Sequence, residues 1–389
     1  MSSGSTALVL DKLLAGCGLE VGGAAGRDPQ VHDPRTYARV LRDGPLGAGE
    51  AYMDGWWDAA DLAGCFEALS RGALDDQFAS LLWREKLRLL RNRLFDRQTV
   101  KLSRRVAEQH YDVPIPFWQH MLGKTMQYSC AYYDRGARNL DEAQVAKMDL
   151  VCEKLQLDDG VTVLETGCGW GSLARHMASR GAVVTSFTLS REQYEYARRH
   201  YAHPNVTFVC SDYRRFEPEE KGKRYDRIAS IGIIEHVGNK NFDNLFSLIR
   251  RFMKPAGWAV VHGMAKVDPT HSGNDPWISR YIFPGGEIPH LRKVIDSITR
   301  CGLNVEDVHN LAFSYPPTLR GWLANVEAHW HEMDLDRAVF DERVLRMWRY
   351  FLSMSIGVFE SRHLQLYHYV VSHRHAPKGA IPGVVTRVR

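Results

Sequence analysis

The chain has 389 residues, of which 44% are hydrophobic, 25% charged and 11% aromatic, a composition that excludes disordered and collagen-like classes. Its formal charge of +4 is too small to indicate a nucleic-acid partner. No apolar run reaches the roughly 18–20 residues of a membrane-spanning helix, and the N-terminus lacks a basic leader followed by a cleavage site. We therefore expect a cytoplasmic protein.

Seven cysteines are scattered along the chain without CxxC or Cys/His spacing. An odd number in this arrangement predicts neither a disulfide framework nor a structural zinc site. We expect free thiols in a reducing compartment and no bound metal.

Residues 1–75 mix short apolar runs with Gly, Pro and Asp, which predicts a small α/β module with several turns. Within it, the pair Trp56-Trp57 is either a ligand or lipid contact or a pair packed in a small core. We prefer the second interpretation because large aromatic side chains are usually buried.

Residues 78–105 predict a basic amphipathic helix, because leucines recur at helical spacing without Gly or Pro. From Arg84 to Arg105, nine basic residues stand against two acidic ones, a surplus larger than the formal charge of the whole chain. The helix is either a docking surface for an anionic membrane or the solvated face of an inter-domain connector. The sequence favours neither alternative.

From about residue 145 the pattern changes to alternating strands and helices. The predicted strands lie in residues 161–171, 182–190, 206–213, 225–237 and 257–265. This rhythm predicts a doubly wound, mostly parallel sheet with right-handed crossovers, in which ligands bind at the carboxyl ends of the strands. We place the domain boundary before this unit, with residues 1–105 as an N-terminal, membrane-associated module with its basic connector and residues 106–389 as the second domain.

The first predicted strand ends in a glycine-rich turn, ETGCGWG (165–171), which opens a helix. The turn differs from the GxGxxG dinucleotide fingerprint and from a P-loop, which needs Gly-Lys-Ser/Thr. An acidic residue followed by alternate glycines is typical of S-adenosylmethionine-dependent methyltransferases. Asp212, after the third strand, is placed to accept from the adenine amine, or else it is a turn residue. Thr188, Ser190 and Gln193 add polar groups on the nucleoside side, and Ser190 is also a candidate helix cap.

Seven motifs in order resemble the bacterial cyclopropane-fatty-acyl-phospholipid synthases. They are MQYSCAYYD (126–134), VLETGCGWGSLA (163–174), TLSREQ (188–193), DYRRF (212–216), IIEHVG (233–238), DPWISRYIFPGG (275–286) and YPPTLRGW (315–322). The match runs from about residue 30 to 373 and includes the N-terminal module, which the similar mycolic-acid cyclopropane synthases lack. The resemblance implies a Rossmann-like class I methyltransferase domain over residues 106–389.

The resemblance also implies the reaction. S-adenosylmethionine donates its methyl carbon to the cis double bond of an unsaturated acyl chain in a membrane phospholipid, and loss of a proton closes a cyclopropane ring. A bound bicarbonate is the expected base. The family's bicarbonate ligands fall on Cys130, Glu235, His262 and Tyr315. Its cofactor contacts fall on Tyr128, Ser129, Gly167, Gly169, Thr188, Gln193 and Asp212.

Each proposed bicarbonate ligand has a plainer alternative. Cys130 alone would be an inert buried thiol, His262 a core histidine in an apolar strand, and Tyr315 a packing aromatic. Glu235 is expected at the end of the fourth strand, where a single glutamate is usually solvated. The motifs around them favour the catalytic interpretation.

The chain departs from the family's usual pattern at four places, of which Glu165 in place of aspartate is chemically mild and Pro316-Pro317 after Tyr315 is less usual. Pro114 and Pro116 replace flexible polar residues, which predicts a reshaped entrance to the acyl site. Met264 stands where isoleucine is common, and we expect its backbone to keep a contact with bicarbonate.

We expect a homodimer that binds the inner face of the membrane peripherally, with helices at about 275–295 and 318–362 roofing an apolar slot. One alternative is a methyltransferase that adds a methyl or methylene branch to an acyl chain or another amphiphile without ring closure. Another is a catalytically idle lipid-binding protein, which intact ligand positions argue against.

Overall fold

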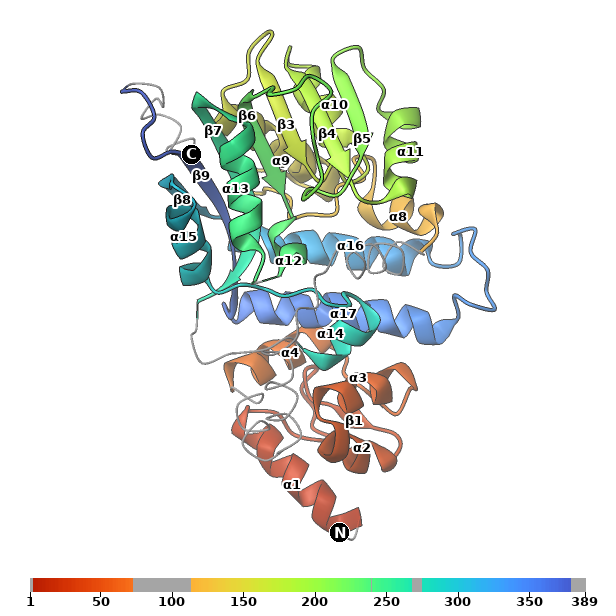
Figure 1. Cartoon of the computed structure of the whole chain (residues 1–389). Helices are drawn as coiled ribbons and strands as arrows, with labels where there is room; N and C mark the ends of the chain where they lie inside the picture. The colour runs from red at the N-terminus through yellow and green to blue at the C-terminus, as the bar shows by residue number, and fades with distance from the viewer. Residues whose placement is uncertain (1–2, 73–112, 239, 268–274, 379–389) are drawn as a thin grey trace.

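A seven-stranded sheet forms the centre of the computed structural model, which describes residues 3–72, 113–238, 240–267 and 275–378. The strand order is β5-β4-β3-β6-β7-β9-β8 (Figure 1). In chain order the strands are β3 (Thr162–Thr166), β4 (Val183–Thr188), β5 (Val206–Cys210), β6 (Tyr225–Ile231), β7 (Met253–Lys266), β8 (Leu303–Asn310) and β9 (Leu364–His373).

The strands from β5 to β7 pair in parallel, whereas β9 runs antiparallel to both β7 and β8. The predicted mostly parallel sheet is confirmed. The sequence analysis did not identify β8 and β9. The chain order reverses between β3 and β6, and a crevice opens at such a switch point in doubly wound sheets.

Helices cover both faces of the sheet, each over its own apolar core. On one face lie α9 (Leu140–Leu155) and α10 (Ser172–Ala178), and on the other lie α12 (Ile234–Val237), α13 (Phe242–Phe252) and α15 (Leu291–Arg300). The helix α11 (Arg191–His200) packs beside β4 and β5. Doubly wound packing follows from strands that are apolar on both faces.

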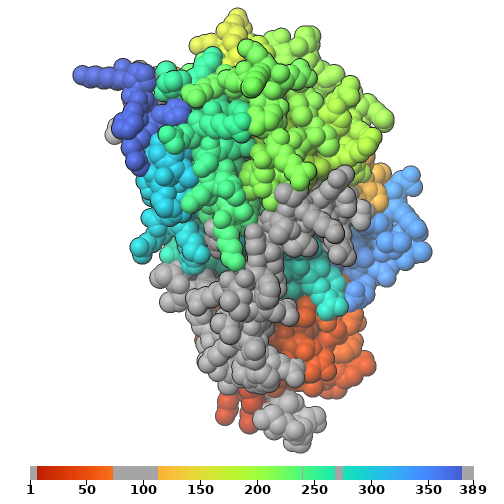
Figure 2. Space-filling model, viewed as in Figure 1, coloured from red at the N-terminus to blue at the C-terminus, as the bar shows by residue number. Residues whose placement is uncertain are grey.

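A third core lies below the sheet and joins the N-terminal residues to later helices. It contains α8 (Ile115–Leu122), α14 (Pro276–Tyr281), α16 (Tyr315–His329) and α17 (Glu342–Glu360). Figure 2 shows the N-terminal residues at one end of the molecule and the sheet domain at the other. Of the predicted roof helices, α15 instead packs against α13 and β8, because its apolar side faces that core.

The N-terminal region is mostly helical. Its helices are α1 (Ser3–Gly16), α2 (Arg35–Asp43), α3 (Pro45–Met53) and α4 (Leu62–Arg71), with one short ladder between β1 (Gln30–Val31) and β2 (Trp57–Asp58). α3 and α4 pack on α17. Trp57 is buried and donates to the Ala48 carbonyl at 2.9 Å, while Trp56 lies half-buried under the guanidinium groups of Arg35 and Arg39. The packed interpretation of the Trp pair is therefore confirmed for Trp57.

Several features expected from the sequence lie beyond the described residues or at their ends. The basic segment 78–105 and the domain boundary after residue 105 lie outside them. Pro114 and Pro116 stand at the N-cap and first turn of α8, where proline lacks only an amide that the helix would leave unpaired. Among the described helices, none is long and apolar enough to cross a membrane.

Candidate active site

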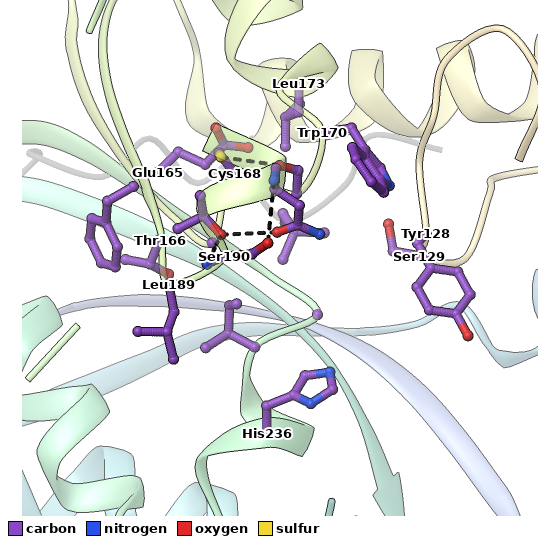
Figure 3. A pocket seen from close by; sticks show the side chains of 18 of the residues that line it. Tyr128, Ser129, Glu165, Thr166, Cys168, Trp170, Leu173, Leu189, Ser190 and His236 are labelled. Atoms are coloured by element: carbon purple, nitrogen blue, oxygen red, sulfur yellow. Dashed lines mark hydrogen bonds between the residues drawn. The ribbon is translucent and has the colours of Figure 1, made fainter. Parts of the chain in front are cut away.

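A pocket opens at the carboxyl ends of β3, β4 and β6, at the switch point of the sheet (Figure 3). Residues from the glycine-rich turn form one wall, and residues after β4 and β5 form another. All seven residues that the resemblance assigns to the cofactor line this pocket: Tyr128, Ser129, Gly167, Gly169, Thr188, Gln193 and Asp212. The structure thus brings together residues that are distant in the chain: Tyr128 and Asp212, for example, are 84 residues apart.

Glycine is required at two positions of the turn for different reasons. Gly167 has φ +80°, and a Cβ there would lie 2.0 Å from Cδ1 of Ile233. Gly169 has φ +50°, and a Cβ there would meet no protein atom within 4 Å. Gly167 therefore permits close packing, whereas Gly169 keeps the pocket side of the turn open.

The loop after β4 holds its own polar side chains in place. The Thr188 hydroxyl donates to Gln193 Oε1 at 2.9 Å. The Ser190 hydroxyl oxygen accepts from the backbone amide of Gln193 at 3.3 Å (Figure 3). Ser190 is therefore the N-cap of α11 and also lines the pocket, so both of its predicted roles are compatible.

Asp212 lines the pocket and also makes the turn that was its alternative role. Its carboxylate accepts from the Arg214 amide at 2.9 Å and from the Arg214 guanidinium at 2.8 and 2.6 Å. Burial raises the pKa of Asp212. The hydrogen bonds and charge of Arg214 together lower it by more, so the net shift is downward. An ionised acceptor therefore stands at the pocket wall.

The segment that carries Tyr128 and Ser129 rests on α9. Gln144 donates to the backbone carbonyls of Gln127 and Ser129, the latter at 2.9 Å. Lys147 donates to the side-chain oxygens of the same two residues. Sequence reasoning missed Gln144 and Lys147, although their spacing of three on one face of a helix with buried apolar neighbours was a usable signal.

Lys147 is an unusual group in this position because it is fully buried. Burial is the largest effect on the pKa of Lys147 and lowers it. The nearby Cys130 and Glu165 groups raise this pKa, but by less. Burial likewise raises the pKa of Glu165, which accepts from the Ser186 hydroxyl beneath the glycine turn. Two buried titratable groups, the basic Lys147 and the acidic Glu165, are thus part of the structure around the pocket.

The four predicted bicarbonate ligands come from four separate elements beside this pocket. Cys130 follows Ser129, His262 lies in β7, and Tyr315 begins α16. The pKa of Tyr315 is raised well above its ordinary value, first by burial and then by the nearby Cys130 and Glu235 groups. Thr318, one turn after Tyr315, donates to the Ser314 carbonyl and accepts from the Ala131 amide at 3.1 Å, with Cys130 Sγ at 3.9 Å.

Glu235 does not end a strand, as we expected. Gly232, with φ +69°, ends β6 at Ile231, and Glu235 lies in the single-turn helix α12. Its Oε1 accepts from the Met264 amide at 2.6 Å, while Oε2 is buried without a hydrogen-bond partner among the described residues. The Met264 amide, part of the backbone expected to contact bicarbonate, thus donates to Glu235 in this structure. Burial raises the pKa of Glu235 to about 7, and the Met264 amide partly offsets this.

Residues 98–369 match the family model described as mycolic acid cyclopropane synthetase. The chain is 38% identical, over 94% of its length and 92% of the relative, to the cyclopropane-fatty-acyl-phospholipid synthase of Escherichia coli K12. The chain belongs to this family of cyclopropane synthases. It is therefore an S-adenosylmethionine-dependent methyltransferase, which confirms the resemblance drawn from the seven motifs.

Other members show the range of the family. The chain is 31% identical to the tuberculostearic acid methyltransferase UfaA1 of Mycobacterium tuberculosis, over 92% of this chain and 87% of that protein. The crystal structure of the mycolic acid cyclopropane synthase CmaA1, complexed with SAH and CTAB, aligns with a TM-score of 0.62 at 28% identity, over 69% of this chain and 97% of that one. The predicted class I methyltransferase fold is confirmed.

Proposed function

We propose that the chain converts cis double bonds in the acyl chains of membrane phospholipids into cyclopropane rings. The observation that carries the proposal is a group of three polar side chains beside the pocket: the buried Cys130 and Glu235 lie near the partly buried Tyr315. His262, also buried, lies in β7 two residues before Met264, whose amide Glu235 binds. Transfer of a methyl group to a nucleophile that already carries a lone pair needs no such cluster. Closing a ring does, because a carbon-bound proton must be removed.

The chain's own residues have three tasks in this reaction. The pocket residues orient the sulfonium so that its methyl group faces the alkene, which lowers the barrier by positioning. The rings of Tyr128 and Phe283, whose centroids lie 6.5 Å apart, offer π faces to the positive charge that develops on the substrate. The buried surroundings keep water from that charge, which prevents formation of an alcohol.

The four cluster residues fit a bicarbonate ion. Burial raises the pKa values of Cys130 and Tyr315, so both keep a proton that they can donate to an oxyanion. Glu235 Oε2, buried and without a partner among the described residues, can accept the single O–H of that ion. When bound, bicarbonate would supply a base that takes the proton lost on ring closure. We propose these four side chains as its ligands.

The test is to incubate the purified chain with S-adenosylmethionine carrying a labelled methyl group and vesicles of cis-unsaturated phospholipid. Mass spectrometry of the acyl chains should show a gain of one CH₂ with loss of the double bond. A gain of CH₂ with the alkene retained would instead support the branching alternative. The similarity to UfaA1 is the reason to test for that product. The absence of labelled lipid would refute both.

We further propose that the chain acts as a homodimer bound peripherally to the inner face of the membrane through its basic segment. The support is the surplus of basic residues between Arg84 and Arg105. Replacing Arg88, Arg91 and Arg93 with Gln should weaken binding to anionic vesicles by roughly 1 kcal/mol per charge and flatten its salt dependence.

A matched control replaces three exposed arginines of α11 with Gln: Arg191, Arg198 and Arg199. It removes the same charge from another surface. Equal loss in both variants would assign the binding to net charge alone, and no loss in either would leave residues 78–105 as a connector. Sedimentation of both variants measures whether the chain forms a homodimer.

A further inference from the structure

Three histidines lie at one register position across the antiparallel part of the sheet. His262 of β7 pairs with His368 of β9, and His368 pairs with His309 of β8. Residues directly opposite each other in neighbouring strands project from the same face. The row therefore runs from the buried cluster outward, with His262 and His368 buried and His309 half-buried.

The first two rings share a hydrogen bond between His262 Nδ1 and His368 Nε2, at 2.9 Å. A neutral imidazole carries one N–H and one bare nitrogen, so only one of these two atoms holds the proton. If His368 Nε2 holds it, His262 Nδ1 accepts and His262 Nε2 carries an N–H. If His262 Nδ1 holds it, His262 Nε2 is bare and His368 Nδ1 carries an N–H.

Two observations favour the first arrangement. His368 Nδ1 is buried without a hydrogen-bond partner among the described residues, and an orphaned buried N–H is rarer than an under-used acceptor. The charges near His368 are positive, since Lys154 and Lys147 both act on it. A positive field disfavours an unpaired N–H and favours a lone pair in its place.

Both rings are neutral, so the choice is one between tautomers. Burial is the largest cause that lowers the pKa of His262, to about 3, and Lys147 and Lys154 add to it. Burial also lowers the pKa of His368 well below its ordinary value, with further contributions from His262, Lys154 and His309. Neither ring therefore takes up a second proton near neutral pH.

We propose that His368 is a positioning residue, which donates from Nε2 to His262 Nδ1 and so fixes His262 in the tautomer that donates from Nε2. The ligand that this donor serves is an oxyanion, and this part of the inference rests on the proposed function. A histidine whose far nitrogen is held by a partner is fixed in orientation as well as in tautomer.

The direct test is the nitrogen-15 spectrum of histidine-labelled protein without bicarbonate or cofactor. The His262 signals are assigned by their absence in the His262→Asn variant. We expect a bare Nδ1 and a protonated Nε2 on His262. A protonated Nδ1 would overturn the proposal, whether or not the chain makes cyclopropanes, so its failure is separate from failure of the proposed function.

Variants of His368 test the consequence for turnover. His368→Leu removes the donor and should lower turnover by about tenfold or more, as loss of a partner to a ligating histidine does elsewhere. His368→Gln keeps an N–H donor and should retain turnover within about twofold of the original chain. Cofactor affinity should stay unchanged in both, because His368 does not line the pocket.

The matched control is His309→Leu, at the same register position but without a hydrogen bond to His262. It should leave turnover unchanged. If His368→Gln falls as far as His368→Leu, the second ring nitrogen is needed and the proposal is wrong. If His368→Leu folds and keeps full turnover, the proposal is also wrong. If it does not fold, the spectrum of the original chain still decides.

Discussion

The cofactor pocket and the buried cluster are neighbours, but their side chains are held by partners at very different distances along the chain. In the pocket, Thr188 and Gln193 are five residues apart, and Asp212 and Arg214 are two apart. In the cluster, Glu235 is held from 29 residues away and His262 from 106. Cys130 has its neighbour Thr318 at a separation of 188 residues.

This difference separates two ways of building a site. The pocket uses loops at strand ends, whose caps and turns form from residues close together in the chain. The cluster uses groups removed from water, each of which needs a partner supplied by the fold. A change in the pocket should therefore act mainly on affinity, and a change in the cluster mainly on turnover.

The largest expected effect tests the cluster. Glu235→Gln keeps the shape but removes the charge, and we expect turnover to fall at least tenfold, which corresponds to more than about 1.4 kcal/mol of transition-state stabilisation. Cofactor affinity, measured by calorimetry, should change little. Glu219→Gln, at an exposed position, is the control. Unaltered turnover in Glu235→Gln would contradict its assigned role.

Two alanine variants separate packing from binding within the glycine turn. Gly167→Ala forces a methyl group into Ile233 at a positive φ and should lower the free energy of unfolding by about 2 kcal/mol or more. Gly169→Ala meets no protein atom, so it should cost only about 1 kcal/mol of stability while weakening cofactor binding. Denaturant unfolding and calorimetry measure the two quantities. Equal stability losses would show that Gly167 is not a packing position.

Lys147→Met tests whether α9 holds the pocket segment in place. Replacing Lys147 by an apolar side chain of similar length removes the cost of burying the amine but also its hydrogen bonds, so the free energy of unfolding should fall by about 1–3 kcal/mol. It also leaves the side-chain oxygens of Gln127 and Ser129 without this donor, so cofactor affinity should fall about fivefold.

The control for this prediction lies on the same helix. Lys154 is also buried, but its partner is Asp307 at 3.3 Å, and neither residue lines the pocket. Lys154→Met should therefore leave cofactor affinity unchanged. Equal losses of affinity in the two variants would mean that α9 acts through general stability.

A further prediction is a dependence of stability on pH. In the folded chain the pKa of Glu235 is raised from 4.5 to about 7, so between these values the folded state keeps a proton that the unfolded state releases. The free energy of unfolding contributed by this group therefore falls as pH rises through that window. The melting temperature of Glu235→Gln should rise relative to the original chain from pH 5 to pH 8. A constant difference would refute the shift.

Most of the sheet domain could be predicted from the sequence. The strands β3 to β7 alternate with helices, and the turn at 165–171 marks the pocket, so local pattern and motif agree. The strands β8 and β9, which follow α15 and α17 closely, were missed because they pair antiparallel and lie outside the parallel repeat. The helix that carries Glu235 was read as strand because Ile231, Ile233 and Ile234 continue the apolar strand pattern and only Gly232, at a positive φ, interrupts them.

The sequence by itself determined the family, the strands from β3 to β7 and seven of the residues that line the pocket, because each of these depends on motifs of residues close together in the chain. Only the tertiary structure revealed that Met264 holds Glu235, that Lys147 supports Ser129 and that His368 shares a hydrogen bond with His262. Such partners are chosen by which groups lose their water together when distant segments pack. No local pattern carries that information, because the desolvation that makes these contacts necessary exists only in the folded chain.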